Sequence, residues 1–597
     1  SLFHFHRNTV LNANTWFNNQ RGTDRVTGEP ISPRNNLIRN QFGGRIGGPV
    51  QIPKIYNGKN KTFFHFLYDA QRIRQRSAVT QLVYTETARR GIFRFFPGVR
   101  NGNAESLSPS VDLSGNPVRN PRATGDLQTV SLYNLDPNRA GPDPSGLVPR
   151  LLGVAPLPNN FRTGDGLNTA GFTWQRRSTD DFNVYNFRVD HNLAAHRITY
   201  SYNAEQEFED NTRYESPFPA SPGGNITRRD RFHSLAVLST IRPNLLNEFR
   251  AGVLRPDYRA RAPWELEQFS SFFPRATGQP FVPVFSANIS DVVVTDDNPV
   301  RLFNPLYQYT NNLTWIKGRH AFKGGIDVRF SSTNSFNSTD VLPRANFGTG
   351  GVPVVGVDRI PGIGQNLTPA INMLNDLSGS LNSVVQALNA EGGDNPQYIP
   401  GQYKYRHWKR PEVAWFFKDD YKVTPNLTLN LGLRWEYYGV PYDPNRRTAA
   451  LAGGSSSIFG ISGSTFADVY QPGRLDGSLT RVELIGPGTR NASRKLYGED
   501  FNNFSPNVGV SWALPTSWGR LFARKTVIRA GYGIAYERQS LRLIDVVSGD
   551  QPGLRERVVF QTASYLDLRG VRLPLQPVGQ PLSVIPLTDR AQTIRSF

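Results

Sequence analysis

The chain has 597 residues, a formal net charge of +20, 54 Gly and 44 Pro. Its nine Trp, 23 Tyr and 37 Phe are more than a disordered chain carries, and the absence of Cys excludes disulfides, thiolate metal sites and a Cys nucleophile. No run approaches the roughly 18–20 apolar residues of a membrane-spanning helix. The composition therefore favours a β-rich chain with long loops.

Alternation of apolar and polar residues predicts strands from the N-terminus onward. In chain order, the predicted strands and strand pairs lie at 42–50, 64–68, 182–190 with 197–203, 232–240 with 247–255, 309–315 with 322–330, and 526–536. Glycines at 43, 44, 47 and 48 lie inside the first of these strands, where we expect a bulge or a close approach of the neighbouring backbone.

The clearest hairpin is predicted at 413–421 and 427–437, joined by a tight connection at 423–426. The second strand keeps a period of two for eleven residues, which is longer than the usual strand of a soluble protein. Trp435, Tyr437 and Tyr438 at its end are expected to form part of an aromatic girdle.

The connections between these strands alternate between short and long. The short ones are 191–196, 241–246, 317–320, 423–426 and 515–525. The long ones are 8–40, 75–181, 206–231, 256–306, 331–411, 440–505 and the chain after 538. Outer-membrane barrels have this arrangement, because their short turns face the periplasm and their long loops face outside.

The pattern thus predicts an all-β fold, an antiparallel transmembrane β-barrel with one face toward lipid and one toward the lumen. A large soluble β-sandwich with one wet face is the structural alternative. One segment departs from the strand pattern: 367–389 has apolar residues at helical spacing, and we expect a short helix there, packed within the long connection 331–411.

Several runs resemble TonB-dependent outer-membrane receptors of the Oar-like subgroup. They are SLFHFHRN (1–8), QFGGRIGGPV (41–50), KTFFHFLYDAQR (61–72), RHAFKGGIDVRF (319–330), WFFKDDYKVTPNLTLNLGLRWEYYG (415–439) and TVIRAGYGIAYER (526–538). The resemblance runs from end to end, and the run at 415–439 is the most specific.

This resemblance implies a barrel of 22 strands plugged by an N-terminal domain. About 13 strands are recognisable here, so residues 1–597 are expected to be a partial barrel without the plug domain and the C-terminal strands. The implied activity is import of a bulky nutrient (a glycan, a peptide or a metal chelate) across the bacterial outer membrane. The implied partners are membrane lipid, the ligand and a TonB-type energy-coupling complex reached through the missing N-terminal part. No cofactor is implied.

Capture of that ligand is assigned to connections 75–181, 256–306 and 331–411, whose Trp, Tyr and Arg side chains can stack on it and donate hydrogen bonds. Two other functions stay open. One is a surface barrel that binds matrix or neighbouring cells without transport, and the other is a soluble carbohydrate-binding β-protein.

We find no sequence motif of an enzyme, because phosphate-loop, zinc-protease and nucleophile-elbow patterns are absent. His4 and His6 share a strand face and could bind a metal, but without a third ligand nearby we interpret them as polar lumen residues. Asp419 and Asp420 are neighbours on a strand and are expected to point to opposite faces. The stretch at 136–146 lacks the register of a calcium loop and is interpreted as a turn-rich surface loop.

The positive charge has two interpretations. A nucleic-acid surface could be argued from 71–76 or 406–410, but elsewhere the cations are dispersed, so solvated loop and lumen surfaces explain them more simply and no nucleic acid is expected. Arg329, Arg434 and Arg529 are predicted to face the lumen, where they would favour an anionic substrate.

Overall fold

The structure is a computed structural model that describes residues 1–20, 23, 28, 34–286, 288–293, 298–453, 481–514, 526–547 and 553–582. The predicted short connection 515–525 and the expected truncation at the C-terminal end lie outside the described residues. So do parts of the predicted connections 8–40, 256–306 and 440–505.

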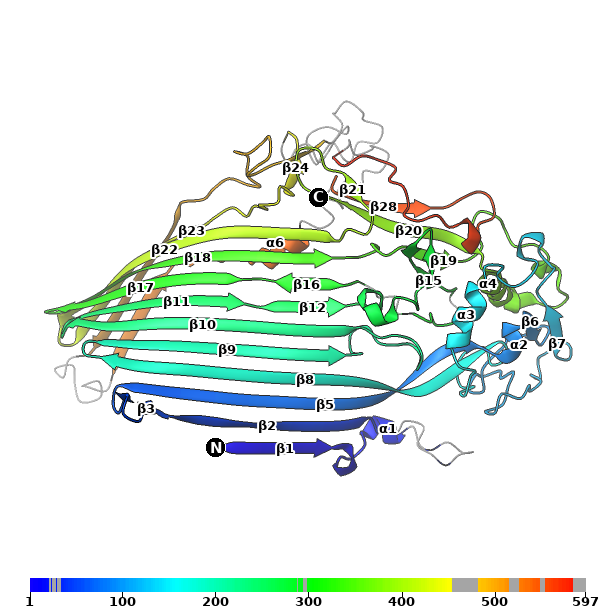
Figure 1. Ribbon diagram of the computed structural model, residues 1–597, viewed down its shortest axis with the longest axis horizontal. Helices are drawn as coiled ribbons and strands as arrows, with labels where there is room; N and C mark the ends of the chain where they lie inside the picture. The colour runs from blue at the N-terminus through cyan, green and yellow to red at the C-terminus, as the bar shows by residue number, and fades with distance from the viewer. Residues whose placement is uncertain are drawn as a thin grey trace.

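One large antiparallel sheet dominates the molecule (Figure 1). Its strands, in spatial order, are β1 (Leu2–Asn8), β2 (Asn36–Pro49), β5 (Thr62–Tyr84), β8 (Thr169–Leu193), β9 (His196–Asp210), β10 (Asn225–Arg242), β11 (Leu245–Arg255), β17 (Leu306–Lys317), β18 (His320–Asn337), β22 (Lys404–Thr424), β23 (Leu427–Tyr438), β26 (Asn503–Ala513) and β27 (Val527–Gly533). Two further strands, β12 (Asp257–Arg261) and β16 (Val300–Phe303), pair with each other and with β10 and β18. The predicted all-β antiparallel fold is confirmed.

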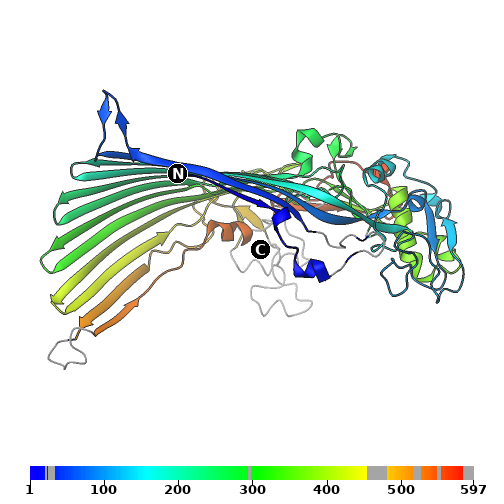
Figure 2. The same ribbon diagram turned by 90° about the horizontal axis from the view of Figure 1, so that it is seen from below.

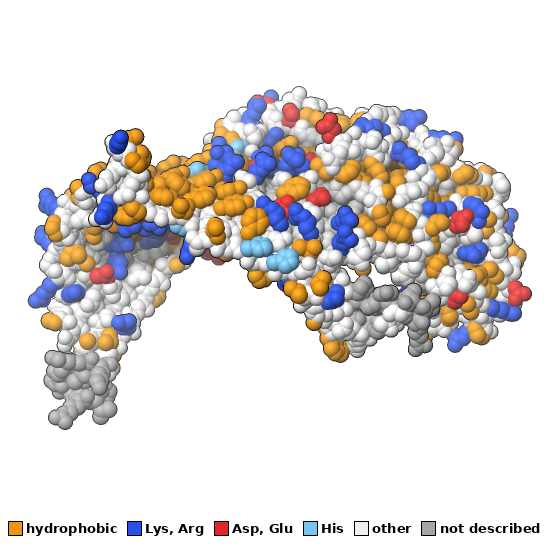
Figure 3. Space-filling view, turned by 60° about the horizontal axis from the view of Figure 1, so that its bottom comes forward, with side chains coloured by type: hydrophobic (Ala, Val, Ile, Leu, Met, Phe, Trp, Pro, Cys, Tyr) orange, Lys and Arg blue, Asp and Glu red, His pale blue; other side chains and the backbone are white. Residues whose placement is uncertain are grey.

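The pairing of residues between neighbouring strands shows which side chains share each face of the sheet. Trp415 lies opposite Ile326 on one side and Trp435 on the other, so the apolar side chains of β18, β22 and β23 share one face. This face is open to the surroundings, with Ile326 and Phe417 each 51% exposed. Figure 3 shows hydrophobic side chains gathered in a band over the sheet. Exposure of so large an apolar surface to water is unfavourable, so this face is suited to contact with lipid. We call it the outer face.

The sheet curls around its polar face, as Figure 2 shows. Strands β1 and β27 lie at its two ends, and no ladder joins them within the part of the chain that the structure describes. The helix α6 (Leu541–Val547) contacts β18 and β22 and lies on the concave side. We call this concave polar face the luminal face.

Strands are longer than the apolar alternation predicts. β5 continues to Tyr84 and β8 begins at Thr169, so the connection between them is shorter than the predicted 75–181. Likewise β18 reaches Asn337 and β22 begins at Lys404, inside the predicted connection 331–411. The ladder hydrogen bonds continue past the apolar band, but apolar and polar side chains no longer alternate there with a period of two, so the sequence signal of a strand disappears.

The predicted helix at 367–389 is only half correct. Helix α4 covers Leu367–Ser378 and ends at Gly379, whose φ of 70° is the left-handed conformation typical of a helix C-terminus. The rest is strand β20 (Leu381–Ala390), in which every residue except Asn382 is buried. Burial on both faces removes the period of two, and the apolar run then resembles a helix.

Long connections fold into a compact body at the end of the sheet opposite the short turns (Figure 1). We call the described parts of 85–168, 262–299, 338–403 and 553–582 the loop cap. Its hydrophobic core takes residues from all four segments, including Phe93, Phe281, Met373 and Leu573. The cap contains α2 (Glu86–Arg89), β6 (Ile92–Phe95), β7 (Gln128–Ser131), α3 (Leu147–Val154), β13 (Arg275–Ala276), β14 (Gln279–Pro280), β15 (Val282–Val284), β19 (Arg344–Phe347), α4, β20, β21 (Tyr398–Ile399) and β28 (Arg555–Phe560).

Outside the cap and the main sheet lie short elements. They are α1 (Trp16–Gln20), the hairpin β3 (Gln51–Ile52) with β4 (Tyr56–Asn57), and the pair β24 (Ala449–Leu451) with β25 (Val482–Leu484). Among the described helices, none has the length and apolar character needed to cross a bilayer.

Candidate functional site

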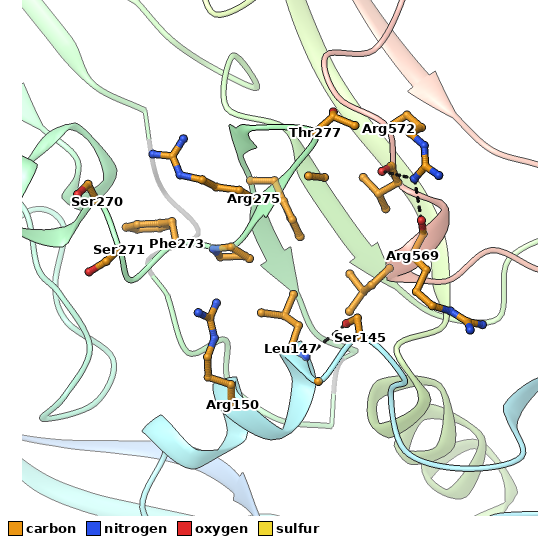
Figure 4. A pocket seen from close by; sticks show the side chains of 16 residues that line it. Ser145, Leu147, Arg150, Ser270, Ser271, Phe273, Arg275, Thr277, Arg569 and Arg572 are labelled. Atoms are coloured by element: carbon orange, nitrogen blue, oxygen red, sulfur yellow. Dashed lines mark hydrogen bonds between the residues drawn. The ribbon is translucent and has the colours of Figure 1, made fainter.

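The loop cap contains a cleft of about 650 Å³ (Figure 4). Its walls come from three of the four cap segments, at 145–150, 270–281 and 568–572. A volume of this size is typical of a site for a small molecule or a short oligomer. The cleft therefore forms only when connections far apart in the chain fold together.

Four arginines line the cleft: Arg150, Arg275, Arg569 and Arg572. Figure 4 places Arg150 and Arg275 on one side of the view and Arg569 and Arg572 on the other. Among the described residues that line it there is no Asp, Glu or His. The four arginines therefore surround a cavity whose described lining has no acidic side chain.

Three of the four charges are not neutralised by a carboxylate. Arg275 donates to the carbonyl of Gly278 at 2.8 Å, and Arg572 donates to the carbonyl of Arg569 at 2.7 Å. Both partners are uncharged backbone groups. Arg150 forms no side-chain hydrogen bond or ion pair within the described part of the chain.

Arg569 is the exception, because it is paired with Asp567. Its Nη2 lies 2.6 Å from Oδ2 of that carboxylate, and this hydrogen bond raises the pKa of Arg569. Asp143, close in sequence to the cleft wall, does not line the cleft. It accepts hydrogen bonds from the Ser145 hydroxyl and the Val148 amide, which hold the first turn of α3.

A tight hairpin fixes one wall. Between β13 and β14, Thr277 and Gly278 have φ of 46° and 89°, as a two-residue turn with two left-handed positions requires. The Thr277 hydroxyl accepts from the Leu573 amide at 2.9 Å and also donates to the Leu573 carbonyl. This pair ties the hairpin to the segment that carries Arg569 and Arg572.

A buried arginine joins two segments of the loop cap. Arg139 is 1% exposed and forms an ion pair with Asp136 at 2.8 Å. It also donates to Asn375 Oδ1 at 2.8 Å and to the carbonyls of Thr349 and Val352 at 2.8 and 3.0 Å. The guanidinium thus links the connection after β5 to the connection after β18.

A second buried group joins three segments. Asp376 of α4 is fully buried and accepts hydrogen bonds from the Tyr84 hydroxyl at 2.6 Å and from the hydroxyl and amide of Ser286 at 2.6 and 2.9 Å. Burial raises the pKa of Asp376 to about 6. Burial also raises the pKa of the neighbouring Asp291 to about 7.

These raised pKa values predict that the cap becomes less stable as pH rises. In the unfolded chain both carboxyls have a pKa near 4, so their contribution is fully present below about pH 4 and is lost as pH rises to about 7. Each carboxyl contributes a slope of up to about 1.4 kcal/mol per pH unit in that window. Pulse proteolysis of the cap in urea at pH 5 and pH 7.5 measures this difference.

The matched control is Asp376→Asn, which has the shape of the neutral carboxyl and cannot ionise. We expect the pH dependence of cap unfolding to be smaller in D376N than in the natural protein. An identical pH dependence in both would contradict the assignment to Asp376.

The three arginines predicted to face the lumen do lie on the luminal face, but the fold does not bring them together. Arg329 forms an ion pair with Asp327, and Arg434 forms one with Glu436, both at 2.8 Å. Arg529 pairs in register with Ser511, which lies opposite Thr428, near the short-turn end of β23 and far from Arg434. Within the described residues Arg529 has no ion pair.

If the complete protein takes up solutes, replacing each of these arginines by Gln is expected to lower uptake of anionic solutes more than uptake of neutral ones. The loss should be largest for R529Q, because the charges of Arg329 and Arg434 are already balanced by their neighbours. Uptake of a matched anionic and neutral pair of labelled solutes measures it. Equal losses for both solutes would contradict an electrostatic role.

A buried charged cluster on the luminal face was not predicted from sequence. Glu412 is 4% exposed and lies 2.7 Å from both Arg410 and Arg538, and Arg538 also donates to the Ser331 hydroxyl at 2.8 Å. Arg538 follows β27 in the chain, so this cluster attaches the segment before α6 to the concave side of β18 and β22. Arg410 and Glu412 are two residues apart on one strand, but Ser331 and Arg538 belong to distant segments, so no sequence spacing shows the whole cluster.

Other sequence predictions have mixed outcomes. Asp419 lies on the outer face with His320 at 2.7 Å and Asp420 pairs with Lys418, so the prediction of opposite faces is confirmed. His4 and His6 share a face as predicted, but the prediction that it is the luminal face is wrong, because they pair with Phe42 and Asn40 of the outer face. The described residues hold no group of three or more potential metal ligands.

Aromatic side chains form two groups on the outer face. Near the short turns, His320, Phe322 and Tyr421 stack, with centroids of His320 and Tyr421 4.2 Å apart. Toward the cap, Trp435 stacks with Tyr437. Tyr438 was expected in this second group, but it is opposite Glu412 on the luminal face, since neighbouring residues of a strand alternate in direction. Two aromatic levels around an apolar band are the arrangement of a membrane barrel.

An antiparallel sheet with an apolar outer face, two aromatic levels and a polar concave face defines the class of outer-membrane β-barrels. The chain belongs to the family described as the outer membrane beta barrel domain, whose family model matches residues 1–594. It is a protein of the bacterial outer membrane, and lipid surrounds its outer face.

A solved structure with a similar arrangement is that of the outer membrane transporter YddB from Escherichia coli. It has 6% sequence identity and a TM-score of 0.34, over 85% of this chain and 49% of that one. The chain thus spans about half the length of that transporter. Among curated proteins, no relative matches the chain.

Proposed function

We propose that this barrel is part of a TonB-dependent receptor of the Oar-like kind, which imports a bulky nutrient with energy delivered from the inner membrane. The observation that supports import over simple adhesion is the loop cap. Its segments share one hydrophobic core and enclose an arginine-lined cleft at the end of the sheet opposite the short turns. A preformed concave site of this kind suits capture of a defined ligand.

The cleft is proposed to bind its ligand and not to convert it. Its described lining has Ser hydroxyls but no His, Asp or Glu that could act as a base toward them. The ligand would be captured by the cap and would then pass along the polar luminal face.

The test is energy-dependent uptake by cells that express the full-length protein. A panel of fluorescent glycans, peptides and ferric chelates is offered with and without a protonophore. We expect at least one solute to accumulate inside, and the protonophore to abolish accumulation while surface binding persists. Surface binding without energy-dependent accumulation for the whole panel would favour a surface barrel that binds matrix or neighbouring cells.

A further inference from the structure

We propose that the cleft of the loop cap binds a soluble polyanion, a ligand with at least two carboxylate, sulfate or phosphate groups. This inference rests on the proposed function and names its substrate class. The observation behind it is the distribution of charge around the cleft. Four arginines line the cleft, and the described lining has no acidic side chain.

Three of the four arginines, Arg150, Arg275 and Arg572, are available for a ligand because no carboxylate neutralises them. Arg275 and Arg572 each donate to a carbonyl through Nη1, which fixes the side chain and leaves other N–H groups of the guanidinium for an oxyanion. Arg150 forms no side-chain bond in the described chain. Guanidinium groups bind planar or tetrahedral oxyanions in pairs of parallel hydrogen bonds.

The spacing of the arginines favours a ligand with more than one charge. Arg150 and Arg275 lie on one side of the cleft, while Arg569 and Arg572 lie on the other (Figure 4). A single small anion would reach only one side of a cavity of about 650 Å³. A ligand that spans the cavity can contact Arg150 and Arg275 on one side and Arg572 on the other.

Apolar side chains complete the lining between the arginines. Leu147, Phe273 and Phe281 come from two of the segments, and Leu568 and Val571 from the third. These surfaces suit the carbon framework of an acidic oligosaccharide better than a fully hydrated inorganic ion. The cleft lies in the cap, beyond the outer face that contacts lipid, which favours a soluble ligand over a lipid headgroup.

The test is equilibrium binding to the purified full-length protein in detergent, with digalacturonate and tripolyphosphate as probes and maltotriose as the neutral comparison. We expect both anions to bind, maltotriose to bind at least tenfold more weakly, and affinity for the anions to fall as salt increases. The double variant Arg150→Gln with Arg572→Gln should lower affinity for the anions at least tenfold.

The matched control is Arg122→Gln with Arg359→Gln, which removes two exposed arginines of the cap outside the cleft. It should leave affinity unchanged. If the Gln variant does not fold, Arg150→Lys with Arg572→Lys keeps the charge and should retain part of the binding.

Equal losses in the cleft and control variants, or no loss in either, would overturn the proposal. Binding only to vesicles that contain lipopolysaccharide, and not to the soluble anions, would also overturn it. Because binding in detergent requires no energy coupling, a failure of uptake with intact anion binding would count against the proposed transport and not against this site.

Discussion

Replacing Arg139 by Met is expected to unfold the loop cap while the membrane sheet stays folded. The change leaves Asp136 buried without its ion pair and removes hydrogen bonds to Asn375, Thr349 and Val352. Breaking a buried ion pair by removing one partner typically costs about 3–5 kcal/mol. Hydrogen exchange resolved by peptide should show cap amides exchanging faster and sheet amides unchanged.

Two controls separate this effect from a general loss of charge. Arg122→Met changes an exposed cap arginine and should leave exchange unchanged. The double change of Arg139→Met with Asp136→Asn removes the unpaired carboxylate and should be less damaging than R139M alone. Protection of the cap in R139M equal to that of the natural protein would refute the role assigned to Arg139.

Replacing Gly43 by Val is expected to prevent assembly of the barrel. A Cβ at Gly43 would lie 2.2 Å from the Tyr68 carbonyl oxygen of β5 and 2.8 Å from the Phe3 ring of β1. Ordinary overpacking costs about 1–3 kcal/mol, and here the nearest atom is backbone, so neither strand can move aside without losing ladder bonds. The folded, heat-modifiable band on a gel should disappear.

Gly48 of the same strand provides the matched comparison. A Cβ there would meet nothing within 4 Å, so Gly48→Val should assemble like the natural protein. If G43V and G48V gave the same yield of folded barrel, the close approach of β2 and β5 would not be what requires glycine at 43.

The membrane sheet could be predicted from sequence because one of its faces contacts lipid. Alternation at 427–437 identified β23, and the glycines of β2 indicated the close backbone approach that Gly43 makes to β5. Alternation of apolar and polar residues no longer reveals a strand where the two faces of the strand have similar surroundings. β20 is buried on both faces, so its apolar run resembles a helix, and the ends of β5 and β8 near the cap mix apolar and polar residues without a period of two, so they resemble a loop.

The cleft could not be predicted for a different reason. Its arginines belong to three segments that only the fold brings together, and no residue near Arg150 or Arg572 marks them as neighbours. The arginines that alternation did identify, Arg329 and Arg434, already have carboxylate partners two residues away on the same strand. Sequence pattern therefore located the correct face for these residues but not the cavity.

The length of β5 has a consequence for where the cap operates. Its outer-face side chains change from Phe66 and Tyr68 to Arg72 and Arg74, and Arg74 is paired with Asp181, so the apolar band ends near residue 70. From there to Tyr84 the strand continues for about 46 Å at roughly 3.3 Å per residue. The sheet thus continues beyond the apolar band and holds the cap away from the bilayer, so a large molecule in the surrounding medium meets the cap before it reaches the lipid.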